Sequence, residues 1–182
     1  MVLLRDLLLR NDEEALMDDI EIVFNLFDSS KINSFFEDVL TFKCGNIINA
    51  HFYDDLQMRD VAYDEIDDLC GFFSKNVTPS SMFLDSINCG IEIHKVVICI
   101  VQGFNGVEIS LNIKKCDFRL SLNECMNFIR HLYNSILSGT VNQITFGYEP
   151  AKDDDMRILV MTVNDEVDIN GVCRKLFGVL NS

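Results

Sequence analysis

The sequence contains few residues that break regular structure: only 2 prolines and 9 glycines occur among its 182 residues, and tryptophan is absent. Apolar residues make up 48 % of the chain, so folding can bury enough apolar surface to offset the loss of chain entropy. This composition excludes a disordered, collagen-like or low-complexity protein. No uncharged apolar run approaches the roughly 18 residues that a membrane-spanning helix needs, so we expect no membrane span.

Signals for secretion and for disulfide bonding are also missing. The N-terminal residues are interrupted by Arg5, Asp6 and Arg10, which differs from the continuous apolar core of a signal peptide. The seven cysteines are odd in number, and no two of them have CxxC spacing. Cys70 and Cys99 lie in apolar runs, where a reduced thiol packs as a small hydrophobic side chain. We therefore predict reduced thiols and a cytoplasmic location.

Motifs that carry catalysis or bind cofactors are absent. The sequence has no G-x-S-x-G, G-x-x-x-x-G-K, G-x-G-x-x-G or H-E-x-x-H. Cys125 and His131 come nearest to a nucleophile and its base, but a separation of six residues on a helix places them on roughly opposite faces. His51 and His94 lie in expected strands with no supporting motif. The sequence therefore predicts no catalytic residue, no cofactor and no enzyme.

Two acidic segments imitate cation sites. Asp153, Asp154 and Asp155 are consecutive, so in an extended chain their side chains point in different directions, and we interpret them as part of a hairpin loop. Residues 166–171 imitate the start of an EF-hand loop, but the twelfth position would be Phe177 instead of a bidentate glutamate. We predict no metal site.

Hydrophobic periodicity predicts a helical N-terminal half, residues 1–79. Apolar residues recur with helical spacing from Leu16 to Phe27 and again from Ile32 to Leu40. A third amphipathic stretch runs on to about Asn76, with Ala62, Ile66, Leu69, Cys70 and Phe73 on one face. Within this half, only residues 46–53 have the β-branched and aromatic content of a strand.

Residues 80–182 predict a sheet-rich half. Five segments have strand character: 81–87, 90–102, 106–115, 143–149 and 157–163. A hairpin turn is expected at 103–106. Ser121 and Glu124 form a capping box that begins a helix, and a last helix begins at about Glu166. We predict one α+β domain, residues 1–182, whose antiparallel sheet comes mainly from 46–53 and 81–163 and packs against helices.

The charge is strongly negative and unevenly distributed. Acidic residues outnumber basic ones 29 to 15, which gives a net charge of −14. Residues 1–79 hold 17 acidic and 6 basic side chains, against 12 and 9 in residues 80–182. Basic residues cluster only at Lys114, Lys115 and Arg119. Because such a chain repels phosphate, we predict that it binds neither nucleic acid nor membrane.

One dense acidic stretch is the candidate partner-binding site. On a helix, the spacing of Asp60, Asp64, Asp67 and Asp68 would place these four carboxylates on one face, where like charges repel. Such a face keeps the protein soluble or docks a basic protein partner, and the sequence leaves both interpretations open, with a metal site as the least favoured third. The candidate residues are Asp54, Asp55, Asp60, Asp64, Glu65, Asp67 and Asp68.

The segment DFRLSLNECMNFIRHLYNSIL, residues 117–137, contains a strand end followed by a capped helix. It is similar to a turn found in several families of bacterial toxin immunity proteins and in Whirly-like domains. With its size, its acidity and its lack of tryptophan, the chain resembles the immunity proteins of toxin systems that include contact-dependent inhibition, over roughly residues 90–138. The resemblance implies tight binding of one toxin, often a basic nuclease, through an acidic surface.

Two other functions remain open at this point. An acidic secretion chaperone of the type III kind is also small and α+β, and would hold an extended effector segment on apolar patches. An enzyme without a recognisable motif is the third possibility. The sequence does not predict the oligomeric state.

Overall fold

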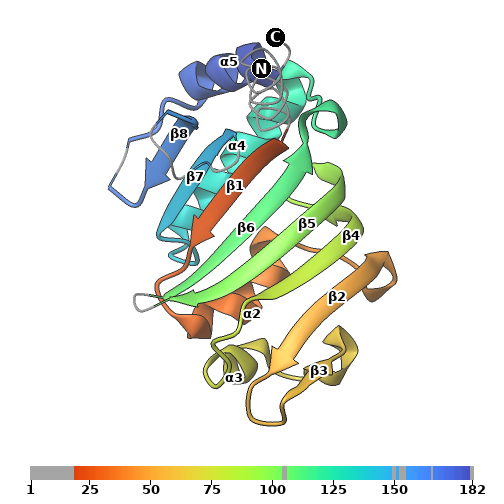
Figure 1. Cartoon of the computed structure of the whole chain (residues 1–182). Helices are drawn as coiled ribbons and strands as arrows, with labels where there is room; N and C mark the ends of the chain where they lie inside the picture. Colours follow the sequence, from red (N-terminus) through yellow and green to blue (C-terminus); the bar gives the residue numbers. More distant parts are fainter. Residues whose placement is uncertain (1–18, 104–105, 149–150, 152–154, 165, 181–182) are drawn as a thin grey trace, which may run out of the picture.

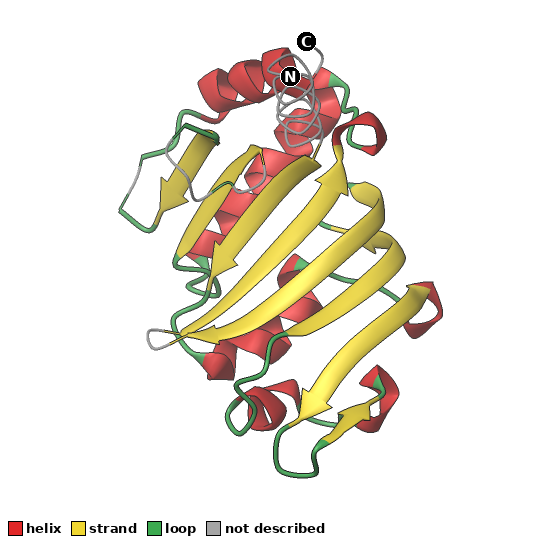
Figure 2. Cartoon of the chain, in the orientation of Figure 1, coloured by secondary structure: helices red, strands yellow, loops and turns green. Residues whose placement is uncertain are grey.

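The computed structural model describes residues 19–103, 106–148, 151, 155–164 and 166–180. Within these residues, eight strands form one sheet and the helical elements pack mainly on one side of it (Figures 1 and 2). The strands are β1 (Asp19–Asn25), β2 (Ile47–Asp54), β3 (Arg59–Val61), β4 (Ser80–Asn88), β5 (Glu92–Gly103), β6 (Gly106–Lys114), β7 (Gln143–Tyr148) and β8 (Arg157–Thr162). The helical elements are η1 (Ser29–Lys31), α2 (Ile32–Ser34), η2 (Phe35–Val39), η3 (Cys44–Asn46), η4 (Tyr63–Glu65), α3 (Leu69–Phe73), η5 (Lys115–Asp117), α4 (Leu122–Leu137) and α5 (Ile169–Leu180).

The strand order is β3-β2-β4-β5-β6-β1-β7-β8, and every neighbouring pair is antiparallel. An antiparallel sheet with helices on one face is an α+β arrangement, which confirms the predicted class. The sheet does come largely from the predicted segments, but β1 was not among them.

The core lies between the sheet and the helices behind it in Figure 2. In β6, Val107, Ile109, Leu111 and Ile113 are buried, whereas the residues between them are half-buried on the opposite face. This confirms the alternation expected for a strand with one covered face. Helix α4 supplies the facing layer and begins at the predicted capping box, in which the Ser121 backbone N–H donates to Glu124 Oε2 over 2.8 Å.

The helix predicted between Leu16 and Phe27 is wrong in its described part, because Asp19–Asn25 is strand β1. Ile20, Ile22 and Phe24 alternate inward and are fully buried. Ile20 and Phe24 fit both this alternation and the predicted helical stripe. The strand period and the helix period are therefore hard to tell apart over so short a segment. Pairing with both β6 and β7 decides in favour of the strand.

The continuous amphipathic helix predicted up to Asn76 is also wrong. The chain there forms β3, the single turn η4 and the short helix α3. Ala62, which the helix would have buried, is exposed, whereas Leu69 and Phe73 are buried as predicted. Repulsion between closely spaced carboxylates disfavours one long helix. The described part of the N-terminal half, residues 19–79, therefore contains three strands as well as helical turns.

Candidate functional site

The predicted partner-binding residues lie in one region, which we call the acidic lobe and define as residues 54–78. It holds the end of β2, the turn to β3, η4 and α3, at the lower end of the molecule in Figure 1. Its seven acidic and two basic side chains give it a net charge of −5. Because the predicted helix does not form, Asp60, Asp64, Asp67 and Asp68 do not share a helix face. The seven candidate carboxylates instead lie on the turns, strand ends and short helices of the lobe.

The turn between β2 and β3 is held by the carboxylate of Asp54. Asp54 Oδ1 accepts hydrogen bonds from the backbone N–H groups of Leu56, at 2.8 Å, and Gln57, at 3.0 Å. This is the turn chemistry for which aspartate is favoured. Met58 ends the turn with φ of 54°, the left-handed conformation in which glycine or asparagine is usual.

Asp55 joins this turn to the loop after α3. Its carboxylate accepts from the backbone N–H of Val77 at 2.7 Å and from the Thr78 hydroxyl at 2.5 Å. In return, Asn76 Oδ1 accepts from the Asp55 N–H at 2.7 Å. The hydroxyl and backbone donors of Thr78, followed by the N–H of Val77, hold the pKa of Asp55 below its ordinary value of 3.8.

Asp68 is the N-cap of α3. Its carboxylate accepts from the Gly71 N–H at 3.0 Å and from Asn33 Nδ2 at 3.1 Å. The Asn33 amide, and then the Gly71 N–H, lower the pKa of Asp68. Asn33 belongs to α2, so this one side chain both caps a helix and connects the lobe to the rest of the fold.

The other candidate carboxylates are more exposed. Asp60 lies 2.9 Å from Nδ1 of His51, and Glu65 lies 3.2 Å from Nη2 of Arg59, both at the surface. Asp64 and Asp67 are exposed, and no hydrogen bond or ion pair within the described ranges engages either carboxylate. Exposed pairs of this kind contribute little to stability. Asp60, Asp64 and Asp67 are therefore the lobe carboxylates that we expect to contribute least to the stability of the fold.

A surface hollow of about 450 Å³ gathers four of the seven predicted residues. Asp54, Glu65, Asp67 and Asp68 line it, whereas Asp55, Asp60 and Asp64 do not. The wall also includes Arg59 and Lys75, together with the apolar side chains of Leu56, Val61, Ile66 and Phe72. The hollow therefore combines apolar walls with carboxylates in excess over cations. Such a lining suits a cationic side chain with a long apolar stem.

Sequence reasoning missed three exposed apolar residues of the same lobe, which we call the apolar tip: Leu56, Met58 and Val77. Their exposed fractions are 73, 78 and 72 %. The first two lie in the turn between β2 and β3, and Val77 lies in the loop that Asp55 binds. The sequence carries no periodic signal for them, because the two loops that carry them are joined by a hydrogen bond between residues 22 positions apart.

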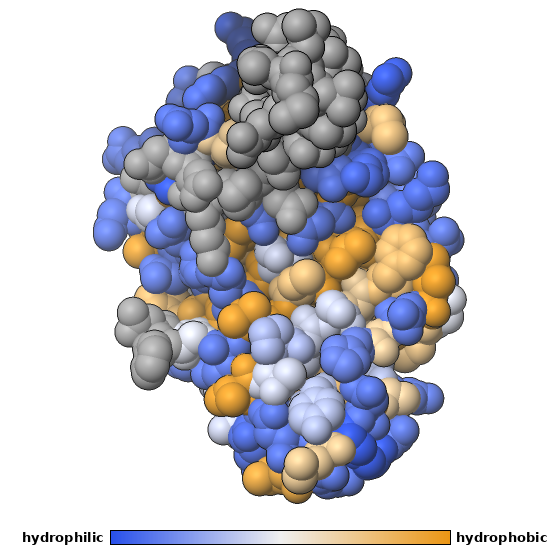
Figure 3. All heavy atoms as spheres, in the orientation of Figure 1, coloured by the Kyte–Doolittle hydropathy of each residue, from blue (hydrophilic) through white to orange (hydrophobic). Residues whose placement is uncertain are grey.

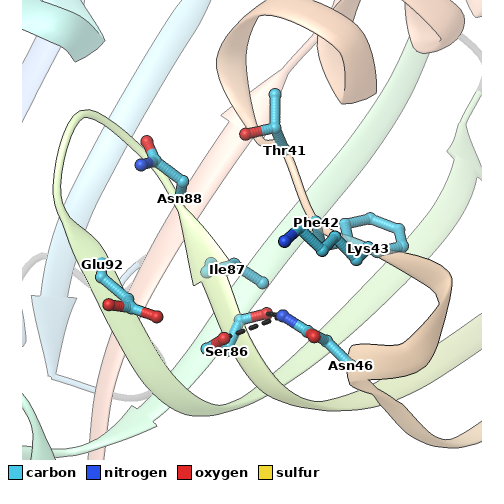
Figure 4. A pocket seen from close by; sticks show the side chains of 8 residues that line it. All are labelled: Thr41, Phe42, Lys43, Asn46, Ser86, Ile87, Asn88 and Glu92. Atoms are coloured by element: carbon cyan, nitrogen blue, oxygen red, sulfur yellow. Dashed lines mark hydrogen bonds between the residues drawn. The ribbon is translucent and has the colours of Figure 1, made fainter.

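A second hollow, of about 510 Å³, lies between the segment after η2 and the adjoining ends of β4 and β5 (Figure 4). Asn46 Nδ2 donates to the carbonyl oxygen of Ser86 at 3.0 Å and to its hydroxyl at 2.8 Å. Thr41 and Asn88 exchange backbone hydrogen bonds of 2.9 and 2.8 Å. These groups hold the segment after η2 against β4, so we assign the hollow no ligand.

The residues nearest to a catalytic pair do not form one. Cys125 is fully buried, and burial raises the pKa of its thiol to about 11. His131 Nε2 lies 2.7 Å from the carbonyl oxygen of Val39, which holds α4 against η2. His51 contacts Asp60, as described above, and His94 is exposed on β5. A thiol of this pKa is almost entirely protonated near neutral pH and is a poor nucleophile.

Other predictions about sites can be compared only where the chain is described. Among the described residues, no cluster of three or more His, Cys, Asp or Glu side chains could hold a metal ion, although Asp153 and Asp154 lie outside them. All seven cysteines are described, and none of them forms a disulfide bond. In the ranges that the structure covers, no helix is both long enough and apolar enough to cross a membrane.

Comparisons with known proteins identify one family and one similar structure. The sequence profile of the family described as PABL017 Cdi1I immunity protein matches residues 18–164. No curated protein matches the sequence. A chain in the crystal structure of the toxic C-terminal tip of CdiA from Pseudomonas aeruginosa in complex with immune protein is similar, with a TM-score of 0.57 and 14 % identity. The match covers 82 % of this chain and 99 % of that chain, and at this identity it shows a shared fold.

Proposed function

Because the chain belongs to the family of Cdi1I immunity proteins, we propose that it binds the toxic C-terminal domain of a CdiA protein and thereby neutralises it. The family match over residues 18–164, which includes the whole acidic lobe, carries this proposal. It also confirms the resemblance to toxin immunity proteins that the sequence suggested. It favours this function over the secretion chaperone and the enzyme.

We propose that neutralisation works by occupation and not by catalysis. Cys125 and His131, the strongest catalytic candidates of the sequence, both serve the packing of α4. The family is described as an immunity protein, which supports a stoichiometric inhibitor. Inhibition should accordingly require one immunity protein for each toxin molecule and should show no turnover.

We propose further that the toxin is a basic protein and that the acidic lobe faces it. A net charge of −5 over 25 residues creates a local negative field that accelerates the approach of a positively charged surface. The helical spacing that first suggested one acidic face is not the reason, since that helix does not form. The support now comes from the hollow that gathers Asp54, Glu65, Asp67 and Asp68.

A nuclease is the toxin class that this surface would suit best. A nuclease holds the phosphate backbone with lysine and arginine side chains, and a set of carboxylates can occupy those side chains in place of phosphate. Bound in this way, the immunity protein would cover the groove that takes nucleic acid. This remains a prediction of the charge pattern.

The experiment uses the full chain and the toxic C-terminal domain of its cognate CdiA protein. The test variant combines Asp60→Asn, Asp64→Asn and Asp67→Asn, because these carboxylates do least for the fold. The matched control removes three exposed charges outside the lobe, with Glu37→Gln, Asp85→Asn and Glu92→Gln. We expect the test variant to bind about tenfold more slowly at low salt and to lose much of its salt dependence.

The control should associate with the toxin as fast as the wild-type protein. Equal association rates for the test variant and the control would contradict a toxin-facing acidic lobe. Failure of the wild-type protein to bind the toxin, or to protect cells that express it, would contradict the immunity function itself.

A further inference from the structure

We infer that the apolar tip of Leu56, Met58 and Val77 is the anchor by which this protein holds its toxin, while the surrounding carboxylates guide the approach. The fitting partner is a protein surface with an apolar depression bordered by lysine and arginine side chains. This inference rests on the proposed immunity function and adds to it the residues that govern the lifetime of the complex.

The exposure of the tip sets it apart from the rest of the described surface. Other exposed large hydrophobic side chains among the described residues are between 36 and 64 % exposed, whereas each tip residue exceeds 70 %. The three most exposed apolar side chains thus lie in two loops that one carboxylate joins. Figure 3 shows apolar surface at the lower end of the molecule, over the turn between β2 and β3, within a hydrophilic surround. Exposed apolar side chains on two joined loops, with polar residues around them, are typical of interaction sites.

The tip is also held in place before any partner binds. Asp54 accepts two N–H groups of the turn, and Asp55 bonds to the backbone of Val77 and to the Thr78 hydroxyl. The Asp55 N–H in turn donates to Asn76 Oδ1, so hydrogen bonds join the two loops in both directions. Leu56 and Val77 are therefore presented on two fixed loops. A surface that is already ordered loses less entropy on binding and binds more tightly.

The backbone conformation and the exposure of Met58 also favour a binding role for the tip. Its φ of 54° is a conformation that glycine adopts without strain, and its side chain is 78 % exposed, so the core hardly compensates for the strain. A large apolar side chain at this position is thus unfavourable for the isolated molecule on both counts. A binding role accounts for it, because a partner would cover the side chain.

The charges around the tip identify the partner. Asp54, Asp60, Glu65, Asp67 and Asp68 belong to the same lobe, and four of them line the hollow beside Leu56. A second copy of this chain would bring two lobes of net charge −5 together, and an anionic lipid surface would repel the lobe equally. A basic protein surface is attracted. Apolar anchors inside a polar rim are the usual arrangement of the residues that dominate binding energy.

The test compares the complex lifetimes of two double variants. The first carries Leu56→Ser and Val77→Ser, and the matched control carries Leu137→Ser and Val163→Ser, at exposed apolar positions outside the lobe. We expect the first variant to dissociate from the toxin domain about 10- to 100-fold faster, with an association rate within about twofold of wild type and an unchanged salt dependence. The control should match the wild-type protein in both rates.

A third variant, Met58→Gly, separates binding from folding, because it removes the side chain where glycine suits the backbone. It should unfold at the same or a higher temperature and yet dissociate faster from the toxin. Wild-type dissociation rates for Met58→Gly and for the first variant would overturn the inference while leaving the immunity function intact. If the wild-type protein sediments as a dimer that Leu56→Ser dissociates, the tip is a self-association surface and the inference is also overturned. Absence of wild-type binding would instead remove the proposed function.

Discussion

The two hairpins of this fold, β5–β6 and β2–β3, are held together by different interactions. In the β5–β6 hairpin, seven residue pairs from Val97–Asn112 to Gly103–Gly106 are in register, and inward side chains such as Ile98 and Leu111 are fully buried. In the β2–β3 hairpin only three pairs form. Backbone N–H groups that donate to the carboxylates of Asp54 and Asp55 hold its turn, and the turn exposes apolar side chains.

The two hairpins therefore differ in what stabilises them and in what they expose to solvent. Burial of an alternating apolar face is the main stabilising interaction of the first hairpin. Carboxylate-to-backbone bonds order the second hairpin, and the same carboxylates leave it highly charged. The first hairpin should therefore be sensitive to changes in volume, and the second to changes in charge and pH.

Removal of core volume in the first hairpin should have the largest effect. Leu111→Ala deletes a fully buried side chain opposite Ile98, so we expect the free energy of unfolding to fall by about 2 to 5 kcal/mol. Urea denaturation followed by circular dichroism measures this. Ser110→Ala, one position away on the other face, should change the unfolding free energy by less than about 1 kcal/mol. A loss as large at Ser110 as at Leu111 would remove the distinction between the two faces.

Removal of the carboxylate that holds the second hairpin should act locally. Asp55→Ala deletes the acceptor for Val77 and Thr78, so amide hydrogen exchange should accelerate at these two residues. Exchange in β5 and β6 should stay slow. Asp64→Ala, at an exposed position in the same lobe, is the control and should leave the pattern unchanged. Uniform acceleration over both hairpins after Asp55→Ala would show that the two regions unfold together.

Acidification should also loosen the β2–β3 hairpin while the β5–β6 hairpin stays ordered. This loss should be spread over a range of pH. The Thr78 hydroxyl lowers the pKa of Asp55, and the Asn33 amide lowers that of Asp68. A carboxyl group whose pKa is lower in the folded state stabilises that state above its unfolded pKa, and the stabilisation is lost as the pH falls through the folded pKa. The lobe should therefore loosen progressively below about pH 5.

Amide exchange of the lobe and of β5–β6, measured between pH 6 and pH 3 and corrected for intrinsic exchange, tests this expectation. The double variant Asp55→Asn and Asp68→Asn cannot titrate at these positions, so its lobe should respond less to pH. Identical profiles for the variant and the wild-type protein would attribute acid sensitivity to other groups.

The smallest expected effect concerns the backbone of the turn. Met58→Gly relieves a left-handed conformation, so we expect the free energy of unfolding to rise by about 1 kcal/mol or less. Gln57→Gly lacks this relief and adds only flexibility to the unfolded chain, so it should lower the stability slightly. Thermal unfolding of both variants measures the difference. A destabilised Met58→Gly protein would show that the methionine side chain supports the turn.

How well the sequence predicts the structure also differs between regions of the molecule. Strong alternation in β6 and the Ser121–Glu124 capping box predicted their elements correctly, because local pattern and long-range packing agree there. In β1, the spacing of Ile20 and Phe24 fitted a helix as well as a strand. Only its pairing with β6 and β7, far along the chain, decides between them.

The acidic lobe was identified by composition but not by geometry. Its high charge density was visible in the sequence, whereas its strands, hollow and apolar tip depend on hydrogen bonds such as those from the Val77 N–H to Asp55 and from the Asn33 amide to Asp68. Side-chain acceptors that select a backbone donor 22 residues away leave no periodic trace. Regions whose local pattern fails to predict the structure are often the regions that serve recognition.

The position of β1 has a consequence for the time at which protection begins. Its register partners lie at 108–114 on β6 and at 143–148 on β7, so β1 cannot complete the sheet until both segments have been synthesised. At a translation rate of about 5 to 20 residues per second, this delay lasts on the order of 6 to 25 seconds. During that interval the apolar β1 segment is accessible to chaperones on the ribosome. A newly synthesised molecule therefore cannot complete its sheet before residue 148 has been made, so the toxin binding proposed for it begins only after that point.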